Sequence, residues 1–197
     1  MEEINIIRKC QLGDMEAFNE LYRLYIGRAM RTAYYISGNK TTAEDIVQEA
    51  FTEAYMKLKS LRTPETFYRW FYIILVRTGW RMVNKSKKIL PVENIFEDTD
   101  IPTFQESVEE TVEVRERNLI IRNALGSLSV PVRTAVVLYY YNDMTIKDIS
   151  KIMGCFQGTV KSRLFQARLQ IKKSLTKQTH EELFDFAHSG KECMNND

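Results

Sequence analysis

Apolar residues recur every three or four positions along most of the chain, and no segment combines strict apolar-polar alternation with hairpin turn residues. The first spacing gathers apolar side chains on one face of an α-helix, whereas alternation would indicate a half-buried strand. The pattern therefore predicts an all-α fold. One of its clear stripes consists of Val47, Ala50, Phe51, Ala54 and Leu58.

Residues that start and stop helices divide the first half of the chain. A short helix over Ile4–Leu12 should end at Gly13, and Asp14 should cap a longer helix that stops at Ser37-Gly38-Asn39. These signals predict a tight connection between the first two helices.

Two more helices should follow in this half. Thr41 and Glu44 have the spacing of a capping box, which predicts the start of the helix that carries the stripe above. After a loop from Lys59, Thr63 as cap and Pro64 at the first helical position indicate another helix, which can run to about Lys88.

The middle of the chain has a different composition. Pro91 to Val114 contains no Lys or Arg and accumulates carboxylates, namely Glu93, Glu97, Asp98, Asp100, Glu106, Glu109, Glu110 and Glu113. Such a segment builds a core poorly. We expect two small helical domains, residues 1–90 and 113–177, joined by a flexible acidic linker over 91–112 and followed by a polar tail over 178–197. Ser107 and Glu110 are candidate caps of a helix that runs to Leu125.

The clearest motif lies in the second domain. A helix from Pro131 through Tyr141 should lead into a turn at Asn142-Asp143. Thr145 and Asp148 then form a second capping box before a short helix, a turn at Gly154 and a long helix, a pattern typical of a helix-turn-helix. The inward positions are Ile146, Ile149, Ile152, Met153, Val160 and Leu164.

The long helix of this motif is basic. It has no acidic residue between Lys161 and Glu181 and carries Lys161, Arg163, Arg168, Lys172, Lys173 and Lys177. Phosphate groups are the expected counter-charge, which favours DNA binding. A helical hairpin with a solvated basic face is the alternative interpretation.

A second basic element lies between Phe67 and Lys88, where no acid interrupts the cations. Aromatic and basic side chains share one stripe of this helix and suit the unstacked bases and backbone of a single strand. The stripe consists of Trp70, Arg77, Arg81, Lys85 and Lys88, whereas Phe67, Phe71, Tyr72 and Ile74 are interpreted as core.

Composition and charge narrow the class of protein but do not indicate a chemical reaction. The formal net charge is only +2, so the location of the charges matters more than their sum. Cys10, Cys155 and Cys193 form no disulfide pattern, no signal peptide is visible, and the apolar run Trp70–Val76 is too short to cross a bilayer. We expect a cytoplasmic protein without membrane insertion.

No pattern typical of an enzyme is present. The chain lacks a GxxxxGK loop and an HExxH motif. His180, His188 and Cys193 lack compact ligand spacing. We therefore expect no catalytic centre, no metal and no cofactor.

Three segments, in this order, resemble the extracytoplasmic-function (ECF) sigma factors of the sigma-70 superfamily. Ala43–Phe51 (AEDIVQEAF) resembles the polymerase-binding motif of that family, Phe67–Tyr72 (FYRWFY) its promoter-melting helix, and Gly158–Arg168 (GTVKSRLFQAR) its recognition helix. The resemblance covers Ile4 to about Leu175. It implies that the first domain is sigma region 2 and the second is sigma region 4.

The resemblance also implies partners and sites. The partners would be core RNA polymerase, promoter DNA and an anti-sigma factor. The implied polymerase contacts are Asp45, Gln48 and Glu49, and the implied minus-ten contacts are Arg62, Trp70, Arg77, Arg81, Lys85 and Lys88. The implied minus-thirty-five contacts are Arg133, Thr159, Lys161, Ser162, Arg163, Phe165, Gln166 and Arg168. Arg77 stands where the family often has Asn, and Phe156 where Pro is common, so promoter preference does not transfer.

A stand-alone helix-turn-helix regulator is the main alternative, with a first domain that senses a ligand or dimerises. It explains the second half equally well. It leaves the Ala43–Phe51 motif and the aromatic-basic helix unexplained.

Overall fold

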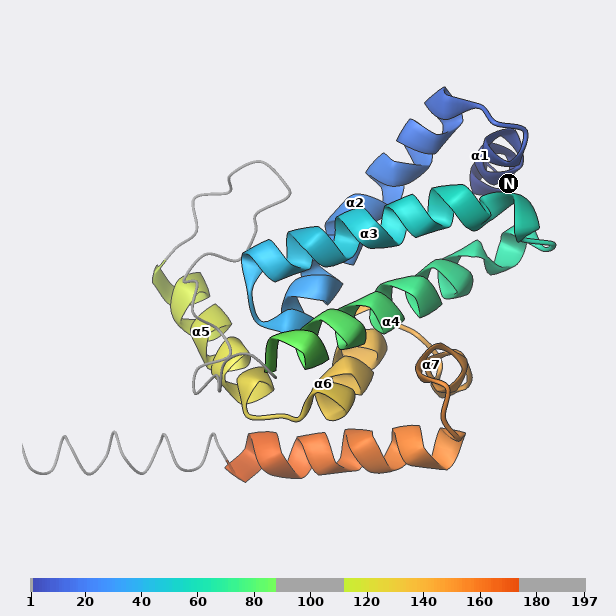
Figure 1. Cartoon of the computed structure of the whole chain (residues 1–197). Coiled ribbons are helices and arrows are strands. Elements are labelled where there is room, and N and C mark those ends of the chain that lie inside the picture. The colour runs from blue at the N-terminus through green and yellow to red at the C-terminus, as the bar shows by residue number, and fades with distance from the viewer. Residues whose placement is uncertain (1, 88–111, 174–197) are drawn as a thin grey trace, which may run out of the picture.

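The computed structural model describes residues 2–87 and 112–173, and every regular element in these ranges is helical (Figure 1). The first half contains α1 (Glu2–Gln11), α2 (Met15–Ser37), α3 (Lys40–Lys57), two 3-10 turns (Leu58–Ser60 and Pro64–Thr66) and α4 (Phe67–Lys87). The second half contains α5 (Val112–Gly126), α6 (Val130–Val136), a π-helical turn (Val137–Tyr141), α7 (Ile146–Met153) and a final helix over residues 157–173. The predicted all-α class is confirmed.

The connections of α2 follow the predicted signals. The Asp14 carboxylate accepts a hydrogen bond from the backbone N–H of Ala17 at 3.1 Å, which satisfies a free donor of the first turn. At the other end, Gly38 adopts a left-handed conformation with φ of 79° and donates its N–H to the carbonyl of Tyr34. Glycine adopts this conformation without a steric penalty, so the chain turns sharply into α3.

The predicted start of α3 is wrong by about two residues. Asn39 is the cap, and its side-chain oxygen accepts from the backbone N–H of Thr42 at 2.9 Å. Asparagine is as strong a cap as threonine, and it comes first after the left-handed Gly38. Thr41 and Glu44 therefore lie inside the helix instead of forming a capping box.

An aromatic cluster between α2, α3 and α4 forms the core of the first half. The rings of Phe51 and Phe71 lie 4.7 Å apart, and those of Tyr25 and Phe67 lie 5.1 Å apart. Phe67, Phe71 and Tyr72 are at most 1% exposed, which confirms them as core. Ring pairs at these distances add to the stability gained from burial.

The second half packs directly against the first. α6 and the π-helical turn lie against α2, and α7 lies against α4 (Figure 1). The buried apolar residues of both halves form one continuous cluster. The reason lies in α4, which is buried on more than one side: Phe71, Tyr72, Leu75, Val76 and Thr78 are all covered. A helix that is apolar on several faces needs cover on more than one side.

Within residues 2–87 and 112–173, no helix is long and apolar enough to span a membrane. The predicted linker lies outside these ranges except for its last residue, Val112. The predicted caps Ser107 and Glu110 and the polar tail also lie outside them.

Candidate nucleic-acid interface

The predicted helix-turn-helix is present in the second half. The Thr145 hydroxyl accepts from the backbone N–H of Asp148 at 3.1 Å and caps α7. Gly154 ends that helix in a left-handed conformation with φ of 62°. The backbone N–H of Cys155 then bonds to the carbonyl of Ser150 at 3.0 Å, which closes the turn into the final helix.

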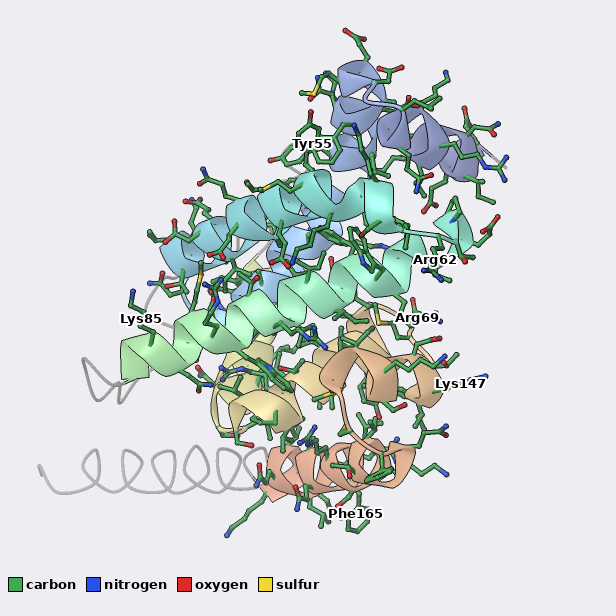
Figure 2. The ribbon with its side chains drawn as sticks, turned by 45° about the vertical axis from the view of Figure 1, so that its right-hand side comes forward. Tyr55, Arg62, Arg69, Lys85, Lys147 and Phe165 are labelled. Carbon is green, nitrogen blue, oxygen red and sulfur yellow. The ribbon has the colours of Figure 1, made fainter. Side chains whose placement is uncertain are left out.

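The final helix has one buried and one exposed face. Val160, Leu164 and Ala167 are at most 4% exposed and attach it to the core. The opposite face carries five exposed side chains that were predicted to contact DNA: Lys161, Ser162, Phe165, Gln166 and Arg168. Phe165 points away from the body of the molecule (Figure 2). A helix with an exposed polar and cationic face of this kind can enter a major groove.

Arg163 and Arg168 of this helix have contacts within the protein. Nη1 of Arg163 lies 3.5 Å from the sulfur of Cys155, and Arg163 is half-buried, as is Thr159. Nε of Arg168 donates to the Tyr140 hydroxyl at 3.0 Å. These contacts orient the two guanidinium groups, with Arg163 held toward the turn and Arg168 left exposed.

A second candidate surface runs along α4. Arg77, Arg81 and Lys85 are exposed along this helix, whereas Trp70 is half-buried with its ring 5.8 Å from that of Phe67. Figure 2 shows Arg62 in the loop before α4 and Lys85 near the other end of the helix. Lys88, the last predicted member of the stripe, lies outside the described residues.

The acidic face of α3 borders this basic stripe. Asp45 and Gln48 are exposed, and Glu49 is partly exposed. Glu49 forms an ion pair with Arg81 of α4. A predicted polymerase contact and a predicted DNA contact therefore neutralise each other in this arrangement. Because both side chains are substantially exposed, the pair stabilises the fold little.

A polar network crosses the boundary between the halves at Asn142, immediately after the π-helical turn. The Tyr72 hydroxyl donates to Oδ1 of Asn142 at 2.7 Å, and Nδ2 of Asn142 donates to the Thr32 hydroxyl at 3.0 Å. The Tyr68 hydroxyl also donates to the Asn142 carbonyl at 3.1 Å. Burial raises the pKa of Tyr72 well above its usual value, so the phenol keeps its proton.

Arg133 lies in the same boundary and is 0% exposed. Its Nη2 donates to the carbonyl of Ile36 at 2.7 Å, and its Nη1 lies 3.5 Å from that of Leu125. These carbonyls belong to the last turns of α2 and α5, where helix dipoles place negative partial charge. Burial lowers the pKa of Arg133 to about 10, which leaves it protonated at neutral pH.

The structure thus corrects the placement of Arg133 on a DNA-facing surface. A fully buried guanidinium that caps two helices cannot touch DNA in this arrangement. The sequence contains no direct signal for this, because arginine is rarely buried in proteins.

Two further polar contacts join the halves near their edges. Nη1 of Arg69 lies 3.2 Å from the carboxylate of Asp148, and Nε1 of Trp80 donates to the Thr134 hydroxyl at 3.0 Å. The hydrogen bond from Thr145 and the charge of Arg69 lower the pKa of Asp148. Neither of the two contacts between the halves was predicted, because their partners are 79 and 54 positions apart in sequence.

No group of metal-ligating side chains occurs within the described residues. His180, His188 and Cys193 lie outside them.

Both halves of the chain match known protein families. Residues 21–89 match the family model described as sigma-70 region 2, and residues 118–171 match that of sigma-70, region 4. The ECF RNA polymerase sigma-E factor of Haemophilus influenzae is 32% identical over 178 residues, covering 86% of this chain and 93% of the relative. The RNA polymerase sigma factor SigV of Bacillus subtilis is also 32% identical, over 148 residues that cover 75% of this chain and 84% of SigV.

Solved structures share the fold. CnrH, solved in complex with the cytosolic domain of CnrY, superposes with a TM-score of 0.66 at 18% identity, covering 89% of this chain and 97% of CnrH. The sigma factor RpoE of Bartonella quintana, solved with the anti-sigma factor NepR, also has a TM-score of 0.66 at 22% identity, covering 82% and 98%.

Proposed function

The chain belongs to the extracytoplasmic-function group of the sigma-70 family, and we propose that it binds core RNA polymerase and directs transcription to specific promoters. The observation that carries this function is the presence of both family regions in their usual order, the second with an exposed basic recognition helix. A stand-alone regulator does not account for the region 2 match over residues 21–89. In this function the polymerase supplies the chemistry and the chain supplies the choice of promoter.

Each surface then has a proposed role. Asp45, Gln48 and Glu49 on α3 contact the polymerase. The exposed cations of α4 and Trp70 hold the melted minus-ten strand, since cations attract the backbone and the indole can stack on a base. The exposed face of residues 157–173 reads the minus-thirty-five duplex, with cations on phosphates and Ser162 and Gln166 on base edges.

We also propose a protein partner and a compartment. CnrH and the Bartonella RpoE, which share this fold, were each solved with a bound protein, and NepR is an anti-sigma factor. An anti-sigma factor for this chain would compete with polymerase and DNA. Polymerase and promoter DNA both occur in the bacterial cytoplasm, where we expect the chain to act.

The test is run-off transcription with purified core polymerase, genomic DNA and the full chain. We expect discrete transcripts that core polymerase alone does not produce. Asp45→Lys should reduce polymerase binding by at least about tenfold, because reversal replaces an attraction by a repulsion across the interface. Binding is measured by fluorescence anisotropy of labelled chain.

The matched control is Glu2→Lys on α1, an exposed acid outside the proposed docking face. It should leave polymerase affinity unchanged. Normal helical content by circular dichroism excludes misfolding of either variant. Specific binding of duplex DNA without polymerase, and no added transcript with it, would instead support a stand-alone regulator.

Arg77 is expected to influence promoter choice. It is exposed on the basic stripe of α4 and stands where the family often has asparagine. Arg77→Asn removes a cation beside the melted strand and substitutes a side chain that can hydrogen-bond to bases, so the ranking of promoters should change. Run-off profiles and permanganate footprints are compared with those of the wild type. Identical profiles would mean that Arg77 faces solvent and has no role in promoter choice.

A further inference from the structure

A groove of about 470 Å³ lies along one side of α2, apart from the surfaces described above. Its walls come from both halves of the chain. The lining residues are Arg23, Leu24, Ile26, Gly27, Arg28, Arg31 and Tyr141. None of the predicted polymerase or DNA contacts is among them.

The groove is strongly cationic. Arg23 and Arg31 stand one helical turn before and one turn after Gly27, so they share one face of α2 with a gap between them. A Cβ placed on Gly27 would meet nothing within 4 Å, so the space between the two arginines is open. Arg28 adds a third guanidinium to the lining.

In the described part of the chain, no carboxylate forms an ion pair with the arginines of the groove. Within residues 2–87 and 112–173, the ion pairs at Lys57, Arg69 and Arg81 include no arginine of the groove. Glu16 and Glu20 border the adjacent groove toward the start of α2, which Arg23 also lines. A concave site with three guanidinium groups and no paired acid favours an anionic ligand.

The second half supplies an aromatic wall. Tyr141 is half-buried at the end of the π-helical turn, and its ring stacks edge-on against Tyr35 at 6.0 Å. On the other side, Arg28 lies close enough to the Tyr68 hydroxyl to oppose the rise in pKa that burial causes there. Tyr68 bonds to the carbonyl of Asn142, so the groove adjoins the network between the halves.

We propose that this groove binds a phosphoryl group. Guanidinium forks match phosphate oxygens in bidentate geometry, and the hollow at Gly27 lets such an anion approach the helix between Arg23 and Arg31. The ligand is either a free phosphoryl compound or the phosphodiester backbone of a nucleic acid. The proposal does not rest on the function proposed above, because the site is tested without polymerase.

The first experiment titrates the full chain with inorganic pyrophosphate by isothermal titration calorimetry. Arg23→Gln combined with Arg31→Gln should weaken binding by at least about tenfold, because hydrogen bonds to charged groups are the strong ones in such a site. The matched control is Arg8→Gln on α1, an exposed arginine outside the groove. It should bind pyrophosphate as the wild type does.

A second variant separates the shape of the groove from its charge. Gly27→Leu keeps all three arginines and fills the hollow between them, so pyrophosphate binding should again fall at least about tenfold. Leucine favours a helix more than glycine does and meets open space here, so the variant should melt at or above the wild-type temperature. Lost binding in a chain that is at least as stable points to the groove itself.

A parallel titration with short oligothymidylate distinguishes the two sources of phosphoryl groups. If the same variants bind the oligonucleotide and pyrophosphate with equally reduced affinity, the ligand is a nucleic-acid backbone. If only the affinity for pyrophosphate falls, the ligand is a free phosphoryl compound. The proposal is overturned if neither ligand loses more affinity in the groove variants than in Arg8→Gln.

Discussion

Replacing Asn142 with alanine should lower the free energy of unfolding of the full chain by about 2–3 kcal/mol. Asn142 is 3% exposed, and its side chain bonds to Tyr72 and Thr32 from the opposite half. Alanine leaves the buried Tyr72 hydroxyl without its acceptor, and an unsatisfied buried polar group costs more than the net value of the bond. Denaturant unfolding followed by circular dichroism measures the change.

Two comparisons make this test specific. Asn84→Ala removes the same groups from an exposed position of α4 and should change stability by less than about 0.5 kcal/mol. Tyr72→Phe should cost about 1 kcal/mol, and the double variant with Asn142→Ala should cost less than the sum of the two single changes. Additive costs would mean that the two side chains do not interact in solution.

Trp80 reports whether the halves separate. Its indole donates to Thr134 across the boundary and is half-buried. In a background with Trp70→Phe, Asn142→Ala should shift the remaining tryptophan emission to longer wavelength if the boundary loosens. Unchanged emission would confine the effect of Asn142 to local packing.

Individual helices were predictable from the chain because their signals are local. Asp14, Gly38, Thr145 and Gly154 act on backbone groups within a few residues, so their chemistry can be recognised without knowledge of the rest of the fold. The start of α3 was placed wrongly because two good caps, Asn39 and Thr41, stand two positions apart. Propensity alone does not decide between them.

The boundary between the halves could not be predicted, because it depends on contacts between distant residues. Tyr72 and Asn142 are 70 positions apart, and Ile36 and Arg133 are 97 apart. The acidic segment between the halves favoured two independent units, whereas the structure covers more than one side of α4. That the two domains fold alone stays a prediction, and the shared core is the reason to test it.

The same boundary explains why the candidate sites were predicted unevenly. The exposed face of residues 157–173 follows from helical spacing alone, since its buried residues fix which side faces outward. Arg133 lies on an element whose every described position but Pro131 is buried, and no periodicity distinguishes a surface cation from one that caps two helices. If Arg133 contacts DNA, the two halves must first separate.

Neutralising Lys161 or Arg168 should weaken binding of the full chain to minus-thirty-five duplexes by about the same factor for every sequence. Both side chains are exposed on the final helix, and a cation that contacts phosphate carries no information about bases. Lys161→Ala and Arg168→Ala should each also reduce the steepness of log affinity against log salt concentration by about 1, because binding then releases one fewer counterion from the DNA. Lys9→Ala on α1 is the control and should leave both quantities unchanged.

Ser162→Ala and Gln166→Ala should behave differently on the same duplexes. If these exposed side chains reach base edges, their removal costs about 1–3 kcal/mol against the preferred sequence and little against scrambled ones, whereas the salt slope stays constant. The duplexes are taken from promoters recovered by run-off transcription, and affinity is measured at several salt concentrations. A uniform loss for all four variants would assign the whole face to phosphate contacts. If Lys161→Ala and Arg168→Ala bind the duplexes with unchanged affinity, residues 157–173 do not form the DNA interface. Deleting an exposed cation from a helix docked on DNA must lower the affinity, because its attraction to phosphate is lost.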